Sequence, residues 1–378
     1  MSHTTFTARK AGEDVASNHF DLIVAGAGLS GITSAAAAAS RGLQVALVSS
    51  GPGSFVFGAG CVEVQNMDRN TPSLREALDF FCNLTELAGC GFRGGLEDKR
   101  YIPTILGCFQ AVSLAPFYMW NGDPTAASQV AVVGIRGLSS FDSNFVAERL
   151  AYHACKLERS TAYTAHEIKL LTVADTFPGT LQFGNRYDRD PRFREELRNA
   201  LLPIAAKANL IILPGILGLK TGQIEIESLE KQLGCMICEL PTLPPSIPGM
   251  RLFNRLERHL RGAGVEFFTG FPIQQLQIEN GHCKGVLLDT PARPLKLLSE
   301  TLILATGAFS GKLLGTSFTS VNHDLHPVDA NSAVIADNVF AAGAILRNST
   351  ARELNAKAIL TGYVGGMLAA GVGVQYAR

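Results

Sequence analysis

The pattern of apolar and polar positions predicts a strand–helix–strand unit near the beginning of the chain. An apolar run covers residues 20–25, a segment of small residues covers 29–40, and a second apolar run covers 43–48. Short apolar runs bounded by glycine are typical of buried parallel strands, and the helix between them returns the chain to the same edge of the sheet. A Gly-x-Gly-x-x-Gly turn at residues 26–31 joins the first strand to the helix. This context predicts a Rossmann-type nucleotide-binding unit.

Alternating strands and helices continue along the chain. In the middle of the sequence the expected elements are strands 129–135, 209–218 and 234–240 and helices 144–157, 223–233 and 250–262. An antiparallel group at 265–269, 273–279 and 282–289 follows, with Asn280-Gly281 as a hairpin signal. Strands 302–308 and 338–345 and helix 352–370 then return the chain to its first domain.

The expected fold class is therefore α/β, a Rossmann-type FAD/NAD(P)-binding domain split around an inserted α/β domain. We place a disordered tail at 1–19, the dinucleotide-binding domain at 20–60 and 290–378, and the inserted domain, for substrate or partner, at 61–289. The length of 378 residues suits two domains.

Composition excludes several classes of partner. The chain has 33 Lys plus Arg and 33 Asp plus Glu, so no excess of positive charge favours nucleic acid or an anionic membrane surface. No apolar run is long enough for a transmembrane segment, and residues 1–19 lack the apolar core of a signal peptide. The expected location is the cytoplasm. Eight scattered cysteines then indicate buried thiols.

Glycines supply the expected nucleotide site. Gly26 permits the tight turn, Gly28 lets the backbone approach a phosphate, and Gly31 lets the helix pack closely on the sheet. The phosphate is expected at the helix N-terminus near Ser30 and Gly31. Gly307 and Gly343 follow two later strands that should end at the same edge.

The residue that should bind the adenosine ribose is missing. An acidic side chain normally ends the second strand of such a unit, but here the strand ends at Ser49 and Ser50, so one of these serines, with Ser49 the candidate, is left to bind the ribose. A serine hydroxyl cannot make the charge-assisted bond that holds a dinucleotide. The sequence therefore predicts FMN, with FAD less favoured.

Other residues could carry chemistry. Cys235 and Cys238 form a single C-x-x-C in a strand-like run, where alternation favours buried thiols over a redox or metal site. No metal site is expected.

Arg251 and Arg255 lie four residues apart at a predicted helix start, and either form a solvated face or converge on a phosphate. His323 and His326 flank Asp324, where a general base would be useful, although isolated loop histidines are common. The catalytic residues stay unassigned.

Several segments together resemble a known family. The turn at 26–31 with Leu304-Ala-Thr-Gly307 and Val339-Phe-Ala-Ala-Gly343 is similar to two-dinucleotide-binding-domain flavoproteins. Residues 132–138 and the proline-rich stretch 240–252 resemble the B subunit of the anaerobic glycerol-3-phosphate dehydrogenases.

The resemblance implies a cytoplasmic FMN-binding subunit that transfers electrons. It further implies a catalytic FAD subunit and an iron–sulfur subunit that anchors the complex at the inner membrane, oxidation of glycerol 3-phosphate to dihydroxyacetone phosphate, and quinone as acceptor.

The sequence departs from this family at two places that hold flavin. Ala344 stands where an Asp usually binds the ribityl chain, and residues 351–357 replace a glycine-rich turn. Two alternatives therefore stay open beside the electron-transferring subunit: a non-catalytic scaffold subunit of the same complex, and a free-standing flavin or nicotinamide oxidoreductase.

Overall fold

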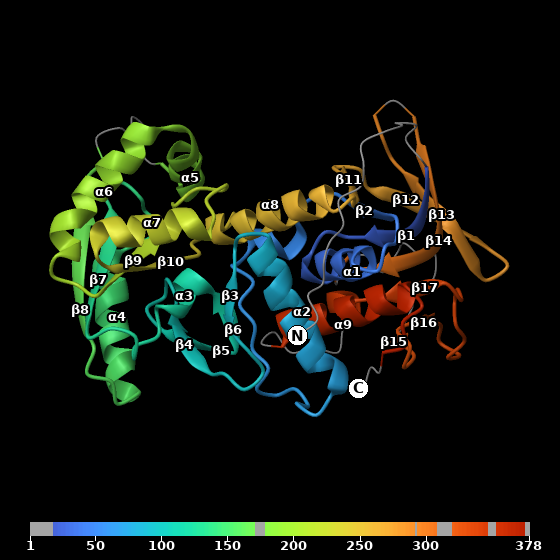
Figure 1. Cartoon of the computed structure of the whole chain (residues 1–378), viewed down its shortest axis with the longest axis horizontal. Coiled ribbons are helices and arrows are strands. Elements are labelled where there is room, and N and C mark those ends of the chain that lie inside the picture. Colours follow the sequence, from blue (N-terminus) through green and yellow to red (C-terminus); the bar gives the residue numbers. More distant parts are fainter. Residues whose placement is uncertain (1–17, 171–177, 292, 308–319, 347–352, 375–378) are drawn as a thin grey trace. The chain divides into compact units, whose positions relative to one another are not determined.

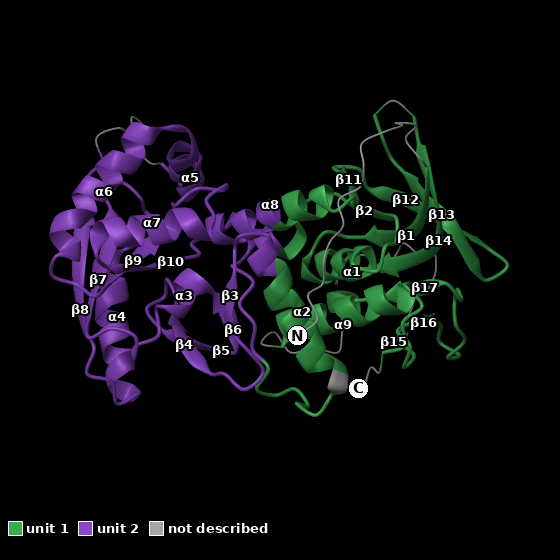
Figure 2. Ribbon diagram, in the orientation of Figure 1, with its two compact units in different colours: residues 1–54, 64–84, 256–378 green, residues 55–63, 85–255 purple. Residues whose placement is uncertain are grey.

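The computed structural model of the chain describes residues 18–170, 178–291, 293–307, 320–346 and 353–374. These residues form two compact units, drawn in separate colours in Figure 2. Unit 1 comprises residues 1–54, 64–84 and 256–378, and unit 2 comprises residues 55–63 and 85–255.

Unit 1 is built on a seven-stranded mixed sheet. Its strands are β1 (His19–Ala25), β2 (Val45–Ser49), β11 (Glu266–Thr269), β12 (Ile273–Glu279), β13 (His282–Leu288), β14 (Leu295–Leu304) and β17 (Val339–Ala341). The order is β11-β2-β1-β14-β13-β12, and β17 also pairs with β14. Five strands are parallel, namely β11, β2, β1, β14 and β17. Their carboxyl ends therefore lie along one edge of the sheet.

Two helices of small residues pack against each other in unit 1. They are α1 (Leu29–Ala39) and α9 (Leu354–Ala369), which lie side by side in Figure 1. A Cβ built on Gly362 would lie 2.5 Å from the Ser30 carbonyl oxygen, and one on Gly366 would lie 2.5 Å from the Ser34 carbonyl oxygen. The two glycines therefore allow the helix backbones to come this close.

The other elements of unit 1 are short or continue into unit 2. The short elements are strands β15 (Ser320–Val321) and β16 (Pro327–Val328) and the 3₁₀ turn η2 (Gly343–Leu346). The boundary between the units falls within η1 (Gly53–Val56), α2 (Pro72–Leu87) and α8 (Ile247–Gly262).

Unit 2 contains a parallel sheet of four strands. They are β7 (Gln129–Ile135), β8 (Ala162–Ile168), β9 (Leu210–Pro214) and β10 (Met236–Leu240), in the order β10-β9-β7-β8. The helices of this layer are α4 (Ser143–Lys156), α5 (Thr180–Arg189), α6 (Pro191–Ala205) and α7 (Gln223–Leu233). Because the chain runs from β7 outward to β8 and then back past β7 to β9, the order reverses between β7 and β9, as in doubly wound folds.

Smaller elements complete unit 2. They are the pair β3 (Phe92–Gly94) and β6 (Leu114–Pro116), the pair β4 (Arg100–Pro103) and β5 (Phe109–Val112), and α3 (Phe117–Trp120). Apolar side chains of the four-stranded sheet and of α4, α6 and α7 form one buried core.

The hairpin between β12 and β13 turns at the predicted residues. Asn280 and Gly281 both have positive φ, at 52° and 74°, which a type I′ turn requires. However, this hairpin lies in the sheet of unit 1, whereas the predicted inserted domain ran from 61 to 289 and included it. The sequence pattern identified the strands but gave no sign of their partners: β11 pairs with β2, and β13 pairs with β14. Of the predicted tail, residues 1–17 lie outside the described residues, and β1 begins at His19.

Candidate functional site

The predicted glycines meet at the carboxyl edge of the unit 1 sheet. Gly26 follows β1, Gly307 lies three residues beyond β14, and Gly343 lies two beyond β17. Since β1 and β17 both pair in parallel with β14, these three turns are neighbours in space. The structure thus brings together three turns that are up to 317 residues apart in the sequence, as the pattern predicted.

Gly26 and Gly31 allow the tight turn that places the start of α1. Gly26 has φ +117°, a conformation that residues with a Cβ rarely adopt, and its amide donates to the Val48 carbonyl over 2.7 Å. A Cβ on Gly31 would overlap the Gly26 carbonyl oxygen. These two glycines therefore have a packing role whether or not a ligand binds.

The start of α1 suits an anion. Gly28 is the N-cap residue, no side chain caps the first turn, and the first turn contains no acidic residue. The amides of a first turn have no acceptor within their own helix and attract negative charge. A Cβ on Gly28 would meet its nearest atom, the Ser54 hydroxyl oxygen, at 3.7 Å. The turn therefore fits a phosphate group.

The loop after β2 lies directly on this turn. We call residues Gly51–Ser54 the strap. Gly53 has φ +59°, and a Cβ built on it would lie 2.9 Å from both the amide nitrogen and the Cα of Gly28. The strap therefore occupies part of the space beside Gly28 from which a phosphate would approach α1.

Ser49, the expected ribose acceptor, is already hydrogen-bonded within the strap. Its hydroxyl donates to the Gly51 carbonyl over 2.6 Å and accepts from the Gly51 amide over 3.0 Å. Ser49 is also buried, whereas Ser50 is exposed. The structure thus gives the Ser49 hydroxyl a local partner in place of a nucleotide ribose.

Gly343 is fixed by residues that the sequence did not single out. Its amide donates to the Thr361 hydroxyl over 2.9 Å, and that hydroxyl donates to the Lys357 carbonyl over 2.6 Å. A Cβ on Gly343 would overlap the Ser30 hydroxyl, so Ser30 lies beneath this turn. Ala344 follows within η2. Of the altered turn at 351–357, residues 351 and 352 lie outside the described residues.

The candidate bases differ in their surroundings. His323 is 80% exposed and lies 3.0 Å from the Asp324 carboxylate. His326 is half-buried, where its Nδ1 contacts the Val339 carbonyl at 2.8 Å and its ring stacks on Phe340. These contacts give His326 a structural explanation.

Arg251 is neither on a solvated face nor open to a phosphate. Its guanidinium forms a bidentate pair with the buried Glu239 carboxylate, at 2.6 and 3.1 Å, and its Nε donates to the Gly218 carbonyl over 2.8 Å. Burial alone lowers the pKa of Arg251, but the Glu239 carboxylate, together with Tyr118 and Tyr187, more than offsets this, so the net pKa is raised. Both alternatives predicted for Arg251 are corrected, because an acidic partner twelve residues away on β10 satisfies the charge.

Arg255 likewise binds backbone. Its Nε donates to the Ala88 carbonyl over 2.9 Å, and its Nη1 donates to the Lys220 carbonyl over 3.1 Å. The guanidinium therefore joins two loops of unit 2, and the predicted convergence of Arg251 and Arg255 on one phosphate does not occur.

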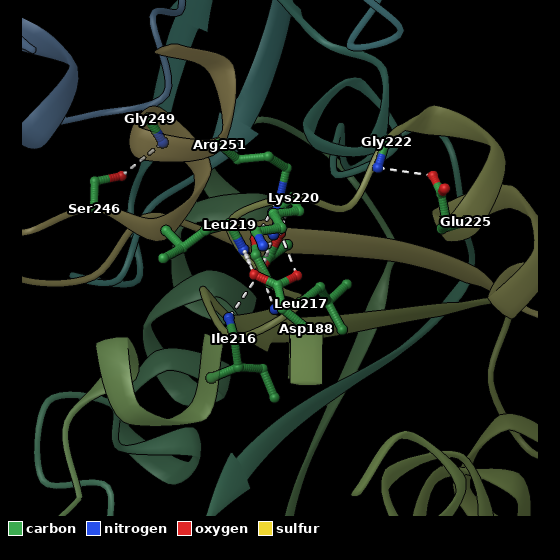
Figure 3. Close-up of polar contacts among 12 residues, drawn as sticks. Asp188, Ile216, Leu217, Leu219, Lys220, Gly222, Glu225, Ser246, Gly249 and Arg251 are labelled. Carbon is green, nitrogen blue, oxygen red and sulfur yellow. Dashed lines mark hydrogen bonds and ion pairs between the residues drawn. The ribbon is translucent and has the colours of Figure 1, made fainter. Parts of the chain in front are cut away.

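Three carboxylates hold the loop between β9 and α7. Glu239 accepts from the Ile216 and Leu217 amides, both over 2.7 Å. Asp188 accepts from the Leu219 and Lys220 amides over 2.8 and 3.3 Å. Glu225 accepts from the Gly222 amide over 2.8 Å. Figure 3 shows these contacts around the loop.

The two cysteines of the C-x-x-C are buried thiols. Burial raises the pKa of Cys235 to about 11 and raises that of Cys238 still further. Both sulfurs are therefore protonated near neutral pH, and a thiol is a much weaker nucleophile and metal ligand than a thiolate.

A family model described as an FAD binding domain matches residues 21–81 and 249–354. The two matched segments flank the part of the chain that forms most of unit 2. The expected fold class, an α/β dinucleotide-binding domain split around an insertion, is confirmed.

Three curated relatives are named as the same protein. The B subunit of anaerobic glycerol-3-phosphate dehydrogenase from Pasteurella multocida is 22% identical over 354 residues, which are 82% of this chain and 80% of the relative. The protein of the same name from Yersinia pestis is 26% identical over 344 residues, with the same coverage. A protein of Halobacterium salinarum, named as a probable B subunit of this dehydrogenase, is 26% identical over 77% of this chain and 75% of its own.

The matched FAD binding domain is split around unit 2, and this supports the resemblance to two-dinucleotide-binding-domain flavoproteins. The chain is similar over 82% of its length to B subunits of anaerobic glycerol-3-phosphate dehydrogenase, and the resemblance seen in the sequence is confirmed.

Solved structures are similar only remotely. L-amino acid deaminase from Proteus myxofaciens matches with a TM-score of 0.34 and 13% identity, over 82% of this chain and half of its own length. Glycine oxidase from Bacillus cereus matches with a TM-score of 0.32 and 14% identity, over 78% of this chain and 59% of its own. Likenesses this weak carry no argument about function. Separately, no helix within the described ranges is both long and apolar enough to span a membrane.

Proposed function

We propose that the chain is the flavin-binding, electron-transferring subunit of a dehydrogenase that oxidises glycerol 3-phosphate to dihydroxyacetone phosphate with quinone as acceptor. The observation that carries the proposal is the uncapped start of α1 at the shared edge of β1, β14 and β17. This edge lies within the segments matched by the FAD binding domain model, in a chain whose relatives are named as the B subunit of that dehydrogenase.

The residues at this edge would hold the cofactor through its phosphate. The first-turn amides of α1, beside Gly28 and Ser30, would donate to the phosphate oxygens, and the turns at Gly307 and Gly343 would border the ligand. A bound flavin supplies hydride acceptance and one-electron transfer. The chain's own contribution would be to bind and orient the cofactor.

The choice between FMN and FAD rests on Ser49. Its hydroxyl is used by Gly51, and it carries no charge with which to bind an adenosine ribose, which supports FMN. The matched family model is described as an FAD binding domain, which supports FAD. Titration with each flavin decides between them, and Ser49→Glu should raise FAD affinity about tenfold while leaving FMN affinity unchanged. If FAD already binds the natural chain more tightly and Ser49→Glu adds nothing, the argument from the ribose is wrong.

The proposed partners are a catalytic FAD subunit and an iron–sulfur subunit that holds the complex at the inner membrane. The relatives are named as one subunit of a dehydrogenase, which supports membership of such an assembly. A cytoplasmic subunit that is peripheral to the membrane through its partners is consistent with the helices described.

The second candidate function is a non-catalytic scaffold subunit of the same complex. It is favoured by the strap lying on Gly28 and by Ala344 in place of an acidic residue. The two candidates differ in whether flavin is present in the working protein.

An absorbance spectrum distinguishes these candidates. The chain is purified alone and again after co-expression with its partner subunits, and released flavin is identified by chromatography. The electron-transferring subunit is expected to carry about one flavin per chain in at least one preparation. A complex that oxidises glycerol 3-phosphate at full rate while this chain carries no flavin would leave only the scaffold role.

A further inference from the structure

Unit 2 contains a cavity beside the loop that the three carboxylates hold. Its volume is about 660 Å³, within the range of small-molecule sites. Figure 3 shows one side of the region, where Asp188 contacts Leu219 and Lys220. The lining comes from the end of α5, from α6, from the β9–α7 loop and from α7.

The cavity lies at the carboxyl end of β9, next to the point where the strand order reverses. The loop residues Lys220 and Thr221 follow β9. The last residues of α6 lead into the start of β9, so the first residues of α6 lie toward the opposite, carboxyl end of that strand. Open parallel sheets bind their ligands at this edge. The position therefore agrees with a ligand site built wholly from residues of unit 2.

Each carboxylate that lines the cavity has a hydrogen-bond or ion-pair partner. Asp188 and Glu225 accept backbone amides of the loop, as described above. Glu195 lies 3.8 Å from the Arg198 guanidinium. Asp188 and Glu225 therefore keep their negative charge, because amides are neutral, but their oxygens face the loop amides, and Glu195 lies beside one arginine.

Two cations of the lining have no carboxylate partner within the described ranges. Arg194 donates to two backbone carbonyl oxygens, that of Tyr187 over 2.6 Å and that of Asp188 over 3.5 Å. In the part of the chain that the structure describes, no carboxylate lies within ion-pairing distance of Arg194 or Lys220. The Nε of Arg198 is buried without a hydrogen-bond partner. The lining therefore has as many carboxylates as cations, and its donor groups without a carboxylate partner among the described residues are Arg194, Lys220 and the Nε of Arg198.

One part of the lining is apolar. Leu229 is buried, whereas Ile224 is 78% exposed, the most exposed large apolar side chain among the described residues. Single exposed apolar side chains are common, but this one borders a cavity that also contains cationic side chains. A ligand with a carbon skeleton would both cover Ile224 and place its charge near the cations.

We propose that this cavity binds a small organic dianion. Its charged group is offered to Arg194, Arg198 and Lys220, and its carbon portion packs on Ile224 and Leu229. The proposal rests on the residues of the cavity and is independent of the flavin site, so either can fail while the other holds.

Calorimetric titration at low salt tests the proposal with three probes: inorganic phosphate, malonate and phenyl phosphate. All three should bind saturably, with phenyl phosphate the tightest because it alone covers Ile224. Lys220→Gln should weaken phenyl phosphate about fivefold to tenfold, because one full charge leaves the cavity while the backbone contacts of residue 220 stay. Raising the salt concentration should weaken binding as well.

Lys231→Gln is the matched control. Lys231 lies on α7 outside the lining of this cavity, and the substitution removes the same charge from a helix that borders it. It should leave the affinity for phenyl phosphate unchanged. The proposal is overturned if no probe gives saturable heat with the natural chain, or if Lys220→Gln and Lys231→Gln bind phenyl phosphate equally well.

Discussion

At the scale of single residues, the glycines of the α1 turn have separable roles. Gly31 lies against the Gly26 carbonyl, whereas a Cβ on Gly28 would be in ordinary van der Waals contact with Ser54. Sequence motifs treat the three glycines as one signature. The structure separates a packing position, Gly31, from a position with room for a Cβ, Gly28, which would border the proposed ligand.

Gly28→Val should therefore remove flavin without unfolding the chain. Its side chain would project into the space that a phosphate must use, while the nearest protein atom leaves room for its Cβ at 3.7 Å. Flavin content per chain and circular dichroism are measured together. Gly31→Ala is the comparison and should destabilise unit 1 by about 1–3 kcal/mol, because the added carbon overlaps backbone. A folded Gly28→Val chain that keeps its flavin would show that the site lies elsewhere.

The strap leads to a second prediction for a single residue: a larger side chain at Gly53 should strengthen flavin binding. A Cβ at Gly53 would press on the Gly28 amide and Cα, so Gly53→Ala should displace the strap from the start of α1. The positive φ of Gly53 costs the variant about 1–2 kcal/mol, which further favours displacement. We expect severalfold tighter flavin binding by fluorescence titration.

Gly51→Ala is the control for the strap, because a Cβ there would meet no atom within 4 Å. It should bind flavin as the natural chain does. Weaker binding by Gly53→Ala alone would mean that the close approach of the strap belongs to the bound state, and the strap would then be part of the site.

At the scale of elements, the sequence predicted those with strong periodicity. Strands β7 and β12 and helix α7 have the predicted bounds, and α1 and the β12–β13 hairpin follow from the glycine turn and Asn280-Gly281. The pattern could not predict which distant segments pair with each other. The Glu239–Arg251 contact joins a strand to a helix that begins after a proline loop, and no periodicity links the two residues.

The α1–α9 contact can be tested on one helix. Gly362→Ala places a carbon 2.5 Å from the Ser30 carbonyl oxygen, so the helices must separate and the start of α1 must shift. We expect a loss of about 1–3 kcal/mol and lower flavin affinity. Gly365→Ala meets only Ile303 Cδ1, at 3.7 Å, and should be neutral or more stable by up to about 1 kcal/mol, because alanine favours helix. Hydrogen exchange of the α1 and α9 amides measures the stability of both variants. Equal loss of protection in Gly362→Ala and Gly365→Ala would refute a role for close packing at Gly362.

The buried ion pair should determine the stability of the β9–α7 loop. Arg251→Met leaves the Glu239 carboxylate buried without its partner, which typically costs about 3–5 kcal/mol. Trp120, the only tryptophan, lies in unit 2 and reports its unfolding in urea by fluorescence. Lys231→Met, at an exposed position on α7 of the same unit, should change stability by no more than about 0.5 kcal/mol. A loss below about 1 kcal/mol for Arg251→Met would mean that the pair is not needed.

At the scale of the whole molecule, two ligand sites would lie in different units and have different chemistry. The edge of unit 1 offers backbone amides in a turn without side-chain charge, which suits a phosphate of a larger cofactor. The cavity of unit 2 offers charged side chains around a loop held by carboxylates. The sequence led to the first, because glycine turns have a fixed spacing. It gave no sign of the second, whose lining comes from four segments with no shared motif.

The isolated chain should not oxidise glycerol 3-phosphate at a useful rate. Alcohol oxidation needs a base that removes the hydroxyl proton, and the two histidines of the 323–326 segment do not supply one: His323 is 80% exposed beside Asp324, and His326 contacts the Val339 carbonyl. Dye reduction by the purified chain, loaded with FMN or FAD, is compared with that of the chain co-expressed with its partner subunits. We expect activity only in the second preparation, and Gly28→Val should lower it there if electrons pass through this chain. Robust dye reduction by the isolated chain would place the oxidising centre here and contradict a division of labour between subunits.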